Sequence, residues 1–232
     1  MQILIFFIRE IEFYYYSDDY PDQYVHCSQD QLGKHKWYFH KFGNGTIKNG
    51  TCKGLDICIG NESDIYCGIL IRSIESDTGE FITGSCNCVN RILQEYSFIK
   101  SQYLIDHMYD LNIFNTNNPI YLLQYESEQN DVHSSPRVGL SLKYPNYLFK
   151  NFRFMTFPSK IPKYRNVFIT KLLNDGYSGE DIINITNLQK RSVDKSIKEY
   201  NEGWSMSNED ALELDATKIN IIYGNWLYNN SY

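Results

Sequence analysis

The chain has 232 residues, of which 42% are hydrophobic and 16% aromatic, so it is long and apolar enough to bury a core. These values exclude an intrinsically disordered tail and a collagen-like fibre. Taken as an average over the whole chain, the formal net charge of −6 argues against a nucleic-acid partner.

The charge is nevertheless distributed unevenly along the chain. Residues 1–136 hold 9 Lys and Arg against 18 Asp and Glu, residues 137–200 hold 12 against 5, and residues 201–232 hold 1 against 5. A basic block therefore lies between two acidic segments. It predicts either a phosphate-binding surface or a solvated positive face that has no partner.

The longest apolar run is far shorter than a membrane span, and the spacing of the cysteines and histidines matches no zinc pattern. We therefore expect an intracellular protein, in the nucleus or cytoplasm and not secreted, with free thiols, no metal and no membrane contact.

The first half of the chain is rich in β-branched and aromatic residues with turn signals between the runs. We predict strands at residues 3–16, 37–41, 52–59 and 66–74, a short helix at residues 84–95, and a further strand at residues 138–142.

From about residue 164 the hydrophobic period becomes helical. Residues 166–174 end at Asp175-Gly176, a second helix begins after the capping residue Ser178, and a third follows Thr186-Asn187. Two short helices joined by a tight turn, the last one basic on its outer face, indicate a helix-turn-helix module. A small three-helix unit that binds protein or is only structural has similar spacing. The predicted domains are 1–160, 161–203 and an acidic extension, 204–232.

One strand carries residues that suit catalysis. Side chains alternate along a strand, so Glu10, Glu12 and Tyr14 share a face, and an aromatic loop that ends in His26 follows them. A carboxylate beside aromatic rings suits a pocket that holds a planar base and activates water. A solvated strand face with ordinary surface glutamates is the alternative.

The order of motifs resembles the alkyladenine (3-methyladenine, methylpurine) DNA glycosylases. The segments that carry the resemblance are Glu10-Ile11-Glu12-Phe13-Tyr14, Pro21-Asp22-Gln23-Tyr24-Val25-His26, Ile69-Leu70-Ile71-Arg72-Ser73-Ile74-Glu75, Gly84-Ser85-Cys86-Asn87-Cys88-Val89, Ser135-Pro136-Arg137-Val138-Gly139-Leu140 and Arg153-Phe154. Together they extend over about residues 7–157.

The resemblance implies an α+β fold with a curved antiparallel sheet and flanking short helices, here followed by the helix-turn-helix-like module. It implies a monofunctional DNA N-glycosylase that flips a modified purine out of duplex DNA and needs no cofactor. Glu12 would deprotonate the attacking water, Arg72 would position it, and Tyr14 and His26 would stack on the base.

Two further substrate-binding positions follow if Gly60 is the glycine that ends the family's hairpin. Asp56 then stands where the family has an aromatic ring on the far side of the base, and Ile59 stands where it has an intercalating tyrosine. The basic block would bind DNA through the cations Arg137, Lys143, Lys190, Arg191, Lys195 and Lys198.

We expect a monomer whose partner is duplex DNA. Two other hypotheses remain open: a catalytically inactive protein on the same fold that binds DNA or RNA, and a tRNA-binding accessory domain of the kind found in formyltransferases.

Overall fold

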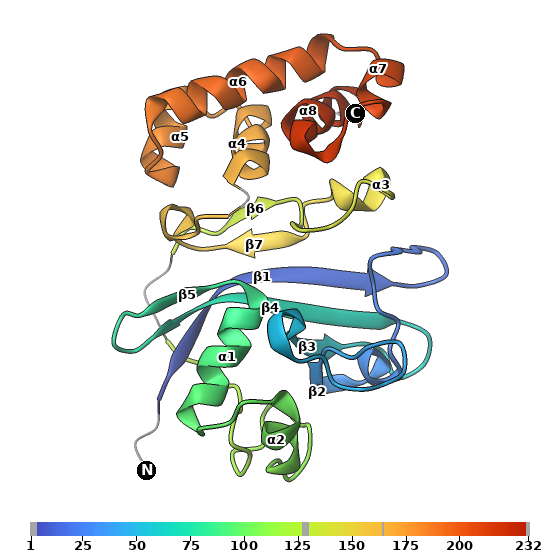
Figure 1. Ribbon diagram of the computed structural model, residues 1–232, viewed down its shortest axis with the longest axis vertical. Helices are drawn as coiled ribbons and strands as arrows, with labels where there is room; N and C mark the ends of the chain where they lie inside the picture. The colour runs from blue at the N-terminus through green and yellow to red at the C-terminus, as the bar shows by residue number, and fades with distance from the viewer. Residues whose placement is uncertain (1–3, 127–129, 164, 231–232) are drawn as a thin grey trace. The chain divides into compact units, whose positions relative to one another are not determined.

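The computed structural model describes residues 4–126, 130–163 and 165–230. Within these residues the chain is an α+β protein with antiparallel strand pairing (Figure 1). It forms two compact units, Met1–Asp131 (unit 1) and Val132–Tyr232 (unit 2). This division differs from the predicted boundary at residue 160, because the segment before that residue packs with the C-terminal helices.

Unit 1 contains an antiparallel sheet whose strands follow the order β2-β3-β4-β1. The strands are β1 (Phe6–Tyr16), β2 (Lys34–Phe39), β3 (Leu55–Ile59), β4 (Tyr66–Ser76) and the short β5 (Phe81–Thr83), which pairs with the end of β4. The four strands predicted in this half are present, with ends shifted by a few residues. Ile3, at the start of the first prediction, lies outside the described residues.

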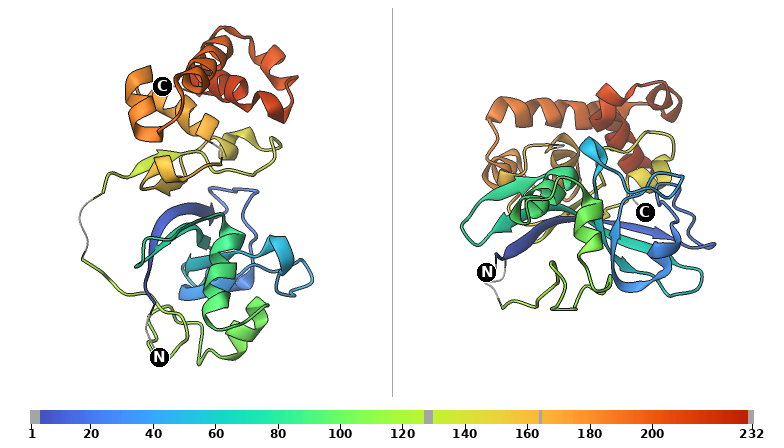
Figure 2. Two further views of the ribbon diagram at one scale, coloured as in Figure 1. Left: turned by 60° about the vertical axis from the view of Figure 1, so that its left-hand side comes forward. Right: turned by 60° about the horizontal axis from the view of Figure 1, so that its bottom comes forward.

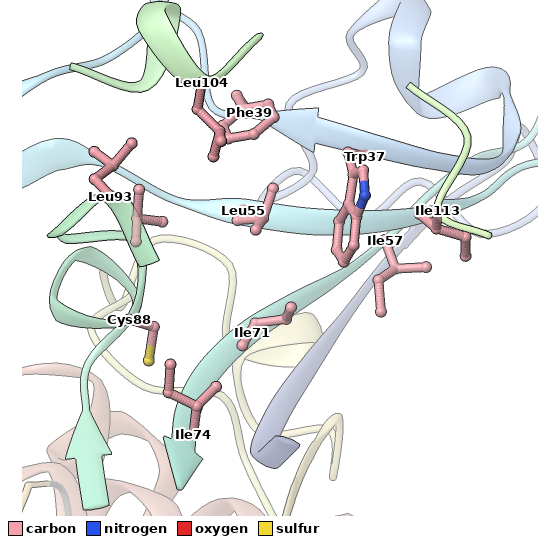
Figure 3. Close-up of a cluster of buried hydrophobic side chains, with 11 residues drawn as sticks. Trp37, Phe39, Leu55, Ile57, Ile71, Ile74, Cys88, Leu93, Leu104 and Ile113 are labelled. Carbon is pink, nitrogen blue, oxygen red and sulfur yellow. The ribbon is translucent and has the colours of Figure 1, made fainter. Parts of the chain in front are cut away.

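One face of this sheet carries the hydrophobic core. Helix α1 (Ser85–Glu95) lies across β4 and β5, and α2 (Ser101–Asp106) follows it (Figures 1 and 2). Gly84 precedes α1 with φ of 93°, a left-handed conformation that glycine adopts without strain. Figure 3 shows how strand and helix side chains meet in this core, which includes Trp37, Phe39, Leu55, Ile57, Ile71, Ile74, Cys88, Leu93, Leu104 and Ile113.

The opposite face of the sheet is polar. The single-turn helix η1 (Gln29–Leu32) packs against β2, β3 and β4. Gly60 allows this approach, since a Cβ at that position would lie 2.4 Å from the backbone oxygens of both Gln31 and Leu32. The polar face is therefore enclosed on the side where β2 and β3 lie.

Unit 2 begins with a small two-stranded ladder. Strand β6 (His133–Ser135) pairs with β7 (Arg153–Met155), and the short α3 (Pro145–Leu148) lies between them in sequence. The strand predicted at residues 138–142 is wrong. Pro136 follows β6 immediately, and Gly139 has φ of 76°, which is incompatible with extended backbone.

The predicted three helices are present as α4 (Arg165–Asn174), α5 (Gly179–Thr186) and α6 (Lys190–Ser205). The tail beyond them is not a separate extension, because α7 (Asn208–Leu212) packs on α8 (Ile219–Asn230), and α8 packs on α6 and α4 (Figures 1 and 2). No helix in the described ranges is long and apolar enough to cross a membrane.

Candidate active site

A buried carboxylate cluster lies on the polar face of the unit 1 sheet. Glu12 of β1 is fully buried, and its Oε2 accepts a hydrogen bond from the Tyr14 hydroxyl at 2.9 Å. The same oxygen lies 3.4 Å from Nη1 of Arg72, which projects from the neighbouring strand β4. Three of the predicted site residues thus meet in one place, as alternation along β1 and pairing with β4 require.

Glu10 extends this cluster along β1. It is 2% exposed, its Oε1 lies 3.4 Å from Nε of Arg72, and its Oε2 accepts a hydrogen bond from the Ser73 hydroxyl. Irregular register on both sides of Glu10 marks a β-bulge in the β1–β4 ladder. A buried charge is costly unless it is paired, and Arg72 lies between the two glutamates as a partner for both. This pairing also holds the two carboxylates in fixed orientations.

A second polar cluster lies on β2 and β3. Asp56 is 2% exposed, and its Oδ1 lies 2.8 Å from Nε2 of His40. The hydroxyl of Tyr38 lies 3.2 Å from Nδ1 of His26, and the rings of His26 and His40 are 4.7 Å apart in an edge-to-face arrangement. Asp56 is therefore a buried partner of His40 and presents no surface on which a base could stack.

The environment of His26 keeps its ring neutral at pH 7. Burial is the largest cause that lowers the pKa of His26 to about 4; the electrostatic effects of His40 and Lys48 act in the same direction, and that of Asp56 opposes them. A neutral ring that shares a hydrogen bond with Tyr38 has one nitrogen left for a donor or acceptor role toward a ligand.

The two clusters share one sheet face. Asp56 and Glu12 are both register partners of Leu70, so the three side chains lie in a row across β3, β4 and β1. Two strand spacings separate the outer residues by about 10 Å. Gly68 leaves room between the clusters, since a Cβ there would lie 2.8 Å from Oδ2 of Asp56.

Ile59 lies at the end of β3 and is 40% exposed, whereas most residues of that strand are buried. This exposure is compatible with the predicted intercalating role of Ile59, which stays a prediction.

Tyr38 and His40 are two polar residues of this face that no sequence motif predicted. The run from Trp37 to His40 alternates between core and polar face, with Trp37 and Phe39 in the hydrophobic core. Alternation was the available signal, but it does not show which polar residues pair across the strands.

Two depressions of about 450 and 400 Å³ flank Trp37, and none of the predicted site residues lines them. In the described ranges, no group of three or more His, Cys, Asp or Glu is arranged to hold a metal ion.

The predicted DNA-binding cations differ in exposure. Lys143 and the four on α6, Lys190, Arg191, Lys195 and Lys198, are exposed. Arg137 is not: it is 1% exposed, its Nη2 donates to the backbone oxygen of Tyr147 at 3.1 Å, and its guanidinium lies over the ring of Phe152. This burial does not favour the expectation that Arg137 contacts phosphate, which stays a prediction.

Comparison with known proteins identifies a viral relative. No family model matches the chain. The chain is 39% identical over 168 residues to an uncharacterized protein, L759, of Acanthamoeba polyphaga mimivirus, and the aligned region covers 66% of this chain and 77% of the viral one. At this identity and coverage, the chain belongs to the same family as the mimivirus protein L759.

Proposed function

We propose that the chain is a DNA glycosylase that flips a modified purine out of duplex DNA and hydrolyses its N-glycosidic bond with water activated by Glu12. The observation that carries the proposal is the meeting of Glu12, Tyr14 and Arg72 on one sheet face, with the Glu12 carboxylate fully buried. These residues were selected together by the resemblance to methylpurine glycosylases, and they come from strands about 60 residues apart in sequence.

The chemistry requires a carboxylate of fixed orientation. The Tyr14 hydroxyl and the Arg72 guanidinium both interact with Oε2 of Glu12, and these two contacts fix the plane of the carboxylate. Ionised Glu12 removes a proton from water as the water oxygen bonds to the sugar carbon and the base leaves with the bonding electrons. Its negative charge also stabilises the positive charge that develops on the sugar.

The second cluster suits recognition of the flipped base. The neutral ring of His26 offers a π-face and a ring nitrogen, with Tyr38 fixing its orientation. His26 lies beside the Asp56–His40 pair, so this side of the proposed site is more polar than one built from aromatic rings alone. A polar side favours a base that has hydrogen-bonding groups on its edge.

The test is a single-turnover assay on duplexes that contain deoxyinosine, ethenoadenine or 3-methyladenine. The wild-type chain is expected to generate alkali-labile sites on at least one of them, and Glu12→Gln is expected to lower the rate by about 10² to 10⁴-fold, the usual contribution of a general base. Glu126→Gln, at an exposed glutamate of the same unit, is the matched control. If the wild-type chain releases none of these bases, or if both variants retain its rate, the proposal fails.

One observation favours a second candidate, a nucleic-acid-binding protein without catalytic activity. Asp56 is buried against His40 at the position where the resemblance places a stacking ring. For this candidate the assay would detect binding of the same duplexes that Glu12→Gln leaves unchanged, with no base released at any enzyme concentration.

A further inference from the structure

The outer face of α6 carries a group of exposed cations that the proposed catalytic function does not use. The helix has 16 residues, and the helical rise makes it about 24 Å long. Its buried residues Val193, Ser196 and Gly203 mark the side that faces the rest of unit 2. Arg191, Lys195 and Lys198 follow the spacing i, i+4, i+7, which places them together on the opposite side.

Helix α6 packs against the two preceding helices, α4 and α5. In α5 the Ser178 hydroxyl accepts a hydrogen bond from the backbone N–H of Asp181, and the Asp181 carboxylate accepts one from the Ser178 N–H. The helix ends at Asn187, which has φ of 53°, and α6 begins three residues later. Fully buried Ile182 and Val193 come from the two successive helices, which contact each other.

The cations are concentrated where such a helix contacts DNA. Residues 190–198 contain Lys190, Arg191, Lys195 and Lys198 and one acid, Asp194, and all five are exposed. Lys195 and Glu199 form an ion pair at 3.7 Å, but the lysine side chain is 76% exposed, so water screens the pair. The charge decreases toward the C-terminal half of the helix, which carries Glu199 and Glu202.

We propose that α6 is a recognition helix that binds in the major groove of duplex DNA. The stripe from Arg191 to Lys198 spans seven helical steps, about 10 Å along the helix, which equals about three base pairs. Arg191 and Lys195, near the N-terminus, contact base edges, while Lys190 and Lys198 contact phosphates. B-form DNA is the partner because its major groove admits an α-helix, whereas that of double-stranded RNA is too narrow.

This assignment goes beyond base excision, because it uses none of the residues on the sheet of unit 1. It gives the chain a preference for particular duplex sequences, carried by unit 2. A chain without glycosylase activity would show the same preference, so the two proposals fail independently.

The test measures binding of the full chain to a fluorescent 24-base-pair duplex of mixed sequence between 50 and 200 mM salt. Each phosphate contact contributes about 0.9 to the slope of log affinity against log salt. Lys190→Gln and Lys198→Gln are each expected to reduce that slope by about 0.9 and to weaken binding. Lys218→Gln is the matched control, since this exposed lysine lies in the same unit in η4 (Ala216–Lys218), away from α6 in sequence.

A second arm tests base recognition with sequences selected by the wild-type chain from a pool of duplexes with random cores. Arg191→Lys is expected to lose the preference at one base pair, because lysine cannot form the planar bidentate hydrogen bonds that arginine donates to guanine. Circular dichroism confirms that the variants fold. The proposal is overturned if Lys190→Gln and Lys198→Gln bind like Lys218→Gln, if the pool yields no preferred sequence, or if double-stranded RNA competes as well as DNA.

Discussion

A methyl group added at Gly203 tests the crossing of α6 and α8. Glycine in a helix normally costs about 1 kcal/mol relative to alanine, so Gly203→Ala in an isolated helix would be stabilising. In this fold, however, the new Cβ would lie 2.2 Å from the backbone oxygen of Ile221 and 2.8 Å from the backbone nitrogen of Asn225. Both neighbours are main-chain atoms, which cannot move aside by changing rotamer.

The size of the effect follows from this geometry. Ordinary contacts of a Cβ begin at 3.4 Å, so the two helices would have to separate by more than 1 Å at the crossing. Separation weakens the hydrogen bonds that the Asn225 side chain donates to the backbone oxygens of Gly203 and Met206, each worth about 1 kcal/mol. Overpacking costs about 1 to 3 kcal/mol, weakening of the two hydrogen bonds adds about 1, and the helix propensity of alanine offsets about 1, so we expect a net loss of about 1 to 3 kcal/mol.

Thermal unfolding followed by the helical circular dichroism signal measures this loss. In a unit of about 100 residues, each kcal/mol lowers the melting temperature by about 4 to 8 °C. Gly224→Ala should show a smaller decrease, because its Cβ would lie 2.9 Å from the backbone oxygen of Tyr200. Gly43→Ala, where nothing lies within 4 Å, is the control. A melting temperature raised by Gly203→Ala would refute the close crossing.

Three further outcomes follow from the same contacts. The pKa of His26 is lowered from 6.5 to about 4, so the unfolded chain takes up the proton at a higher pH than the folded chain does. The free energy of unfolding of unit 1 should therefore fall as pH falls from about 6.5 toward 4. Urea unfolding at several pH values should show that this free energy depends less on pH in His26→Gln than in the wild-type chain. Ser178→Ala removes the cap of α5 and should cost about 1 kcal/mol in the same experiment. Cys52 is exposed, whereas Cys58 is fully buried and burial raises its pKa to about 12. A thiol reagent should therefore label Cys52 in the native state and Cys58 only after unfolding, which mass spectrometry measures.

The pattern of hydrophobic residues along the chain predicted the helices and strands that bury one face and expose the other. The strands of unit 1 alternate or carry β-branched runs, and α5 begins at the Ser178 cap. The failure at residues 138–142 has the same origin: apolar residues alternate there as in a strand, but Gly139 adopts a left-handed conformation. Helix α8 gave no periodic signal because much of it is buried, and its packing depends on glycines in two separate helices.

The candidate site required information that is not local. Alternation alone predicts that Glu12 and Tyr14 share a face, but it does not bring Arg72 to them. That meeting depends on the register of β1 against β4, which shifts at the bulge beside Glu10. Likewise, the pairing of His40 with Asp56 depends on close packing against Gly54, where a Cβ would lie 2.4 Å from Nδ1 of His40.

The placement of charge explains how a chain of net charge −6 can bind DNA as proposed. Unit 1 holds 18 of the 28 acidic residues, but four of them, Glu10, Glu12, Asp22 and Asp56, are at most 2% exposed. The four cations of residues 190–198 are all exposed. Salt at 0.1 M screens charges beyond about 10 Å, so the attraction between α6 and phosphate depends on the charges within that distance and not on the sum over the chain. Acidic groups farther than about 10 Å from α6 weaken binding mainly at low salt, and a slope that flattens below about 50 mM salt would be their measurable effect.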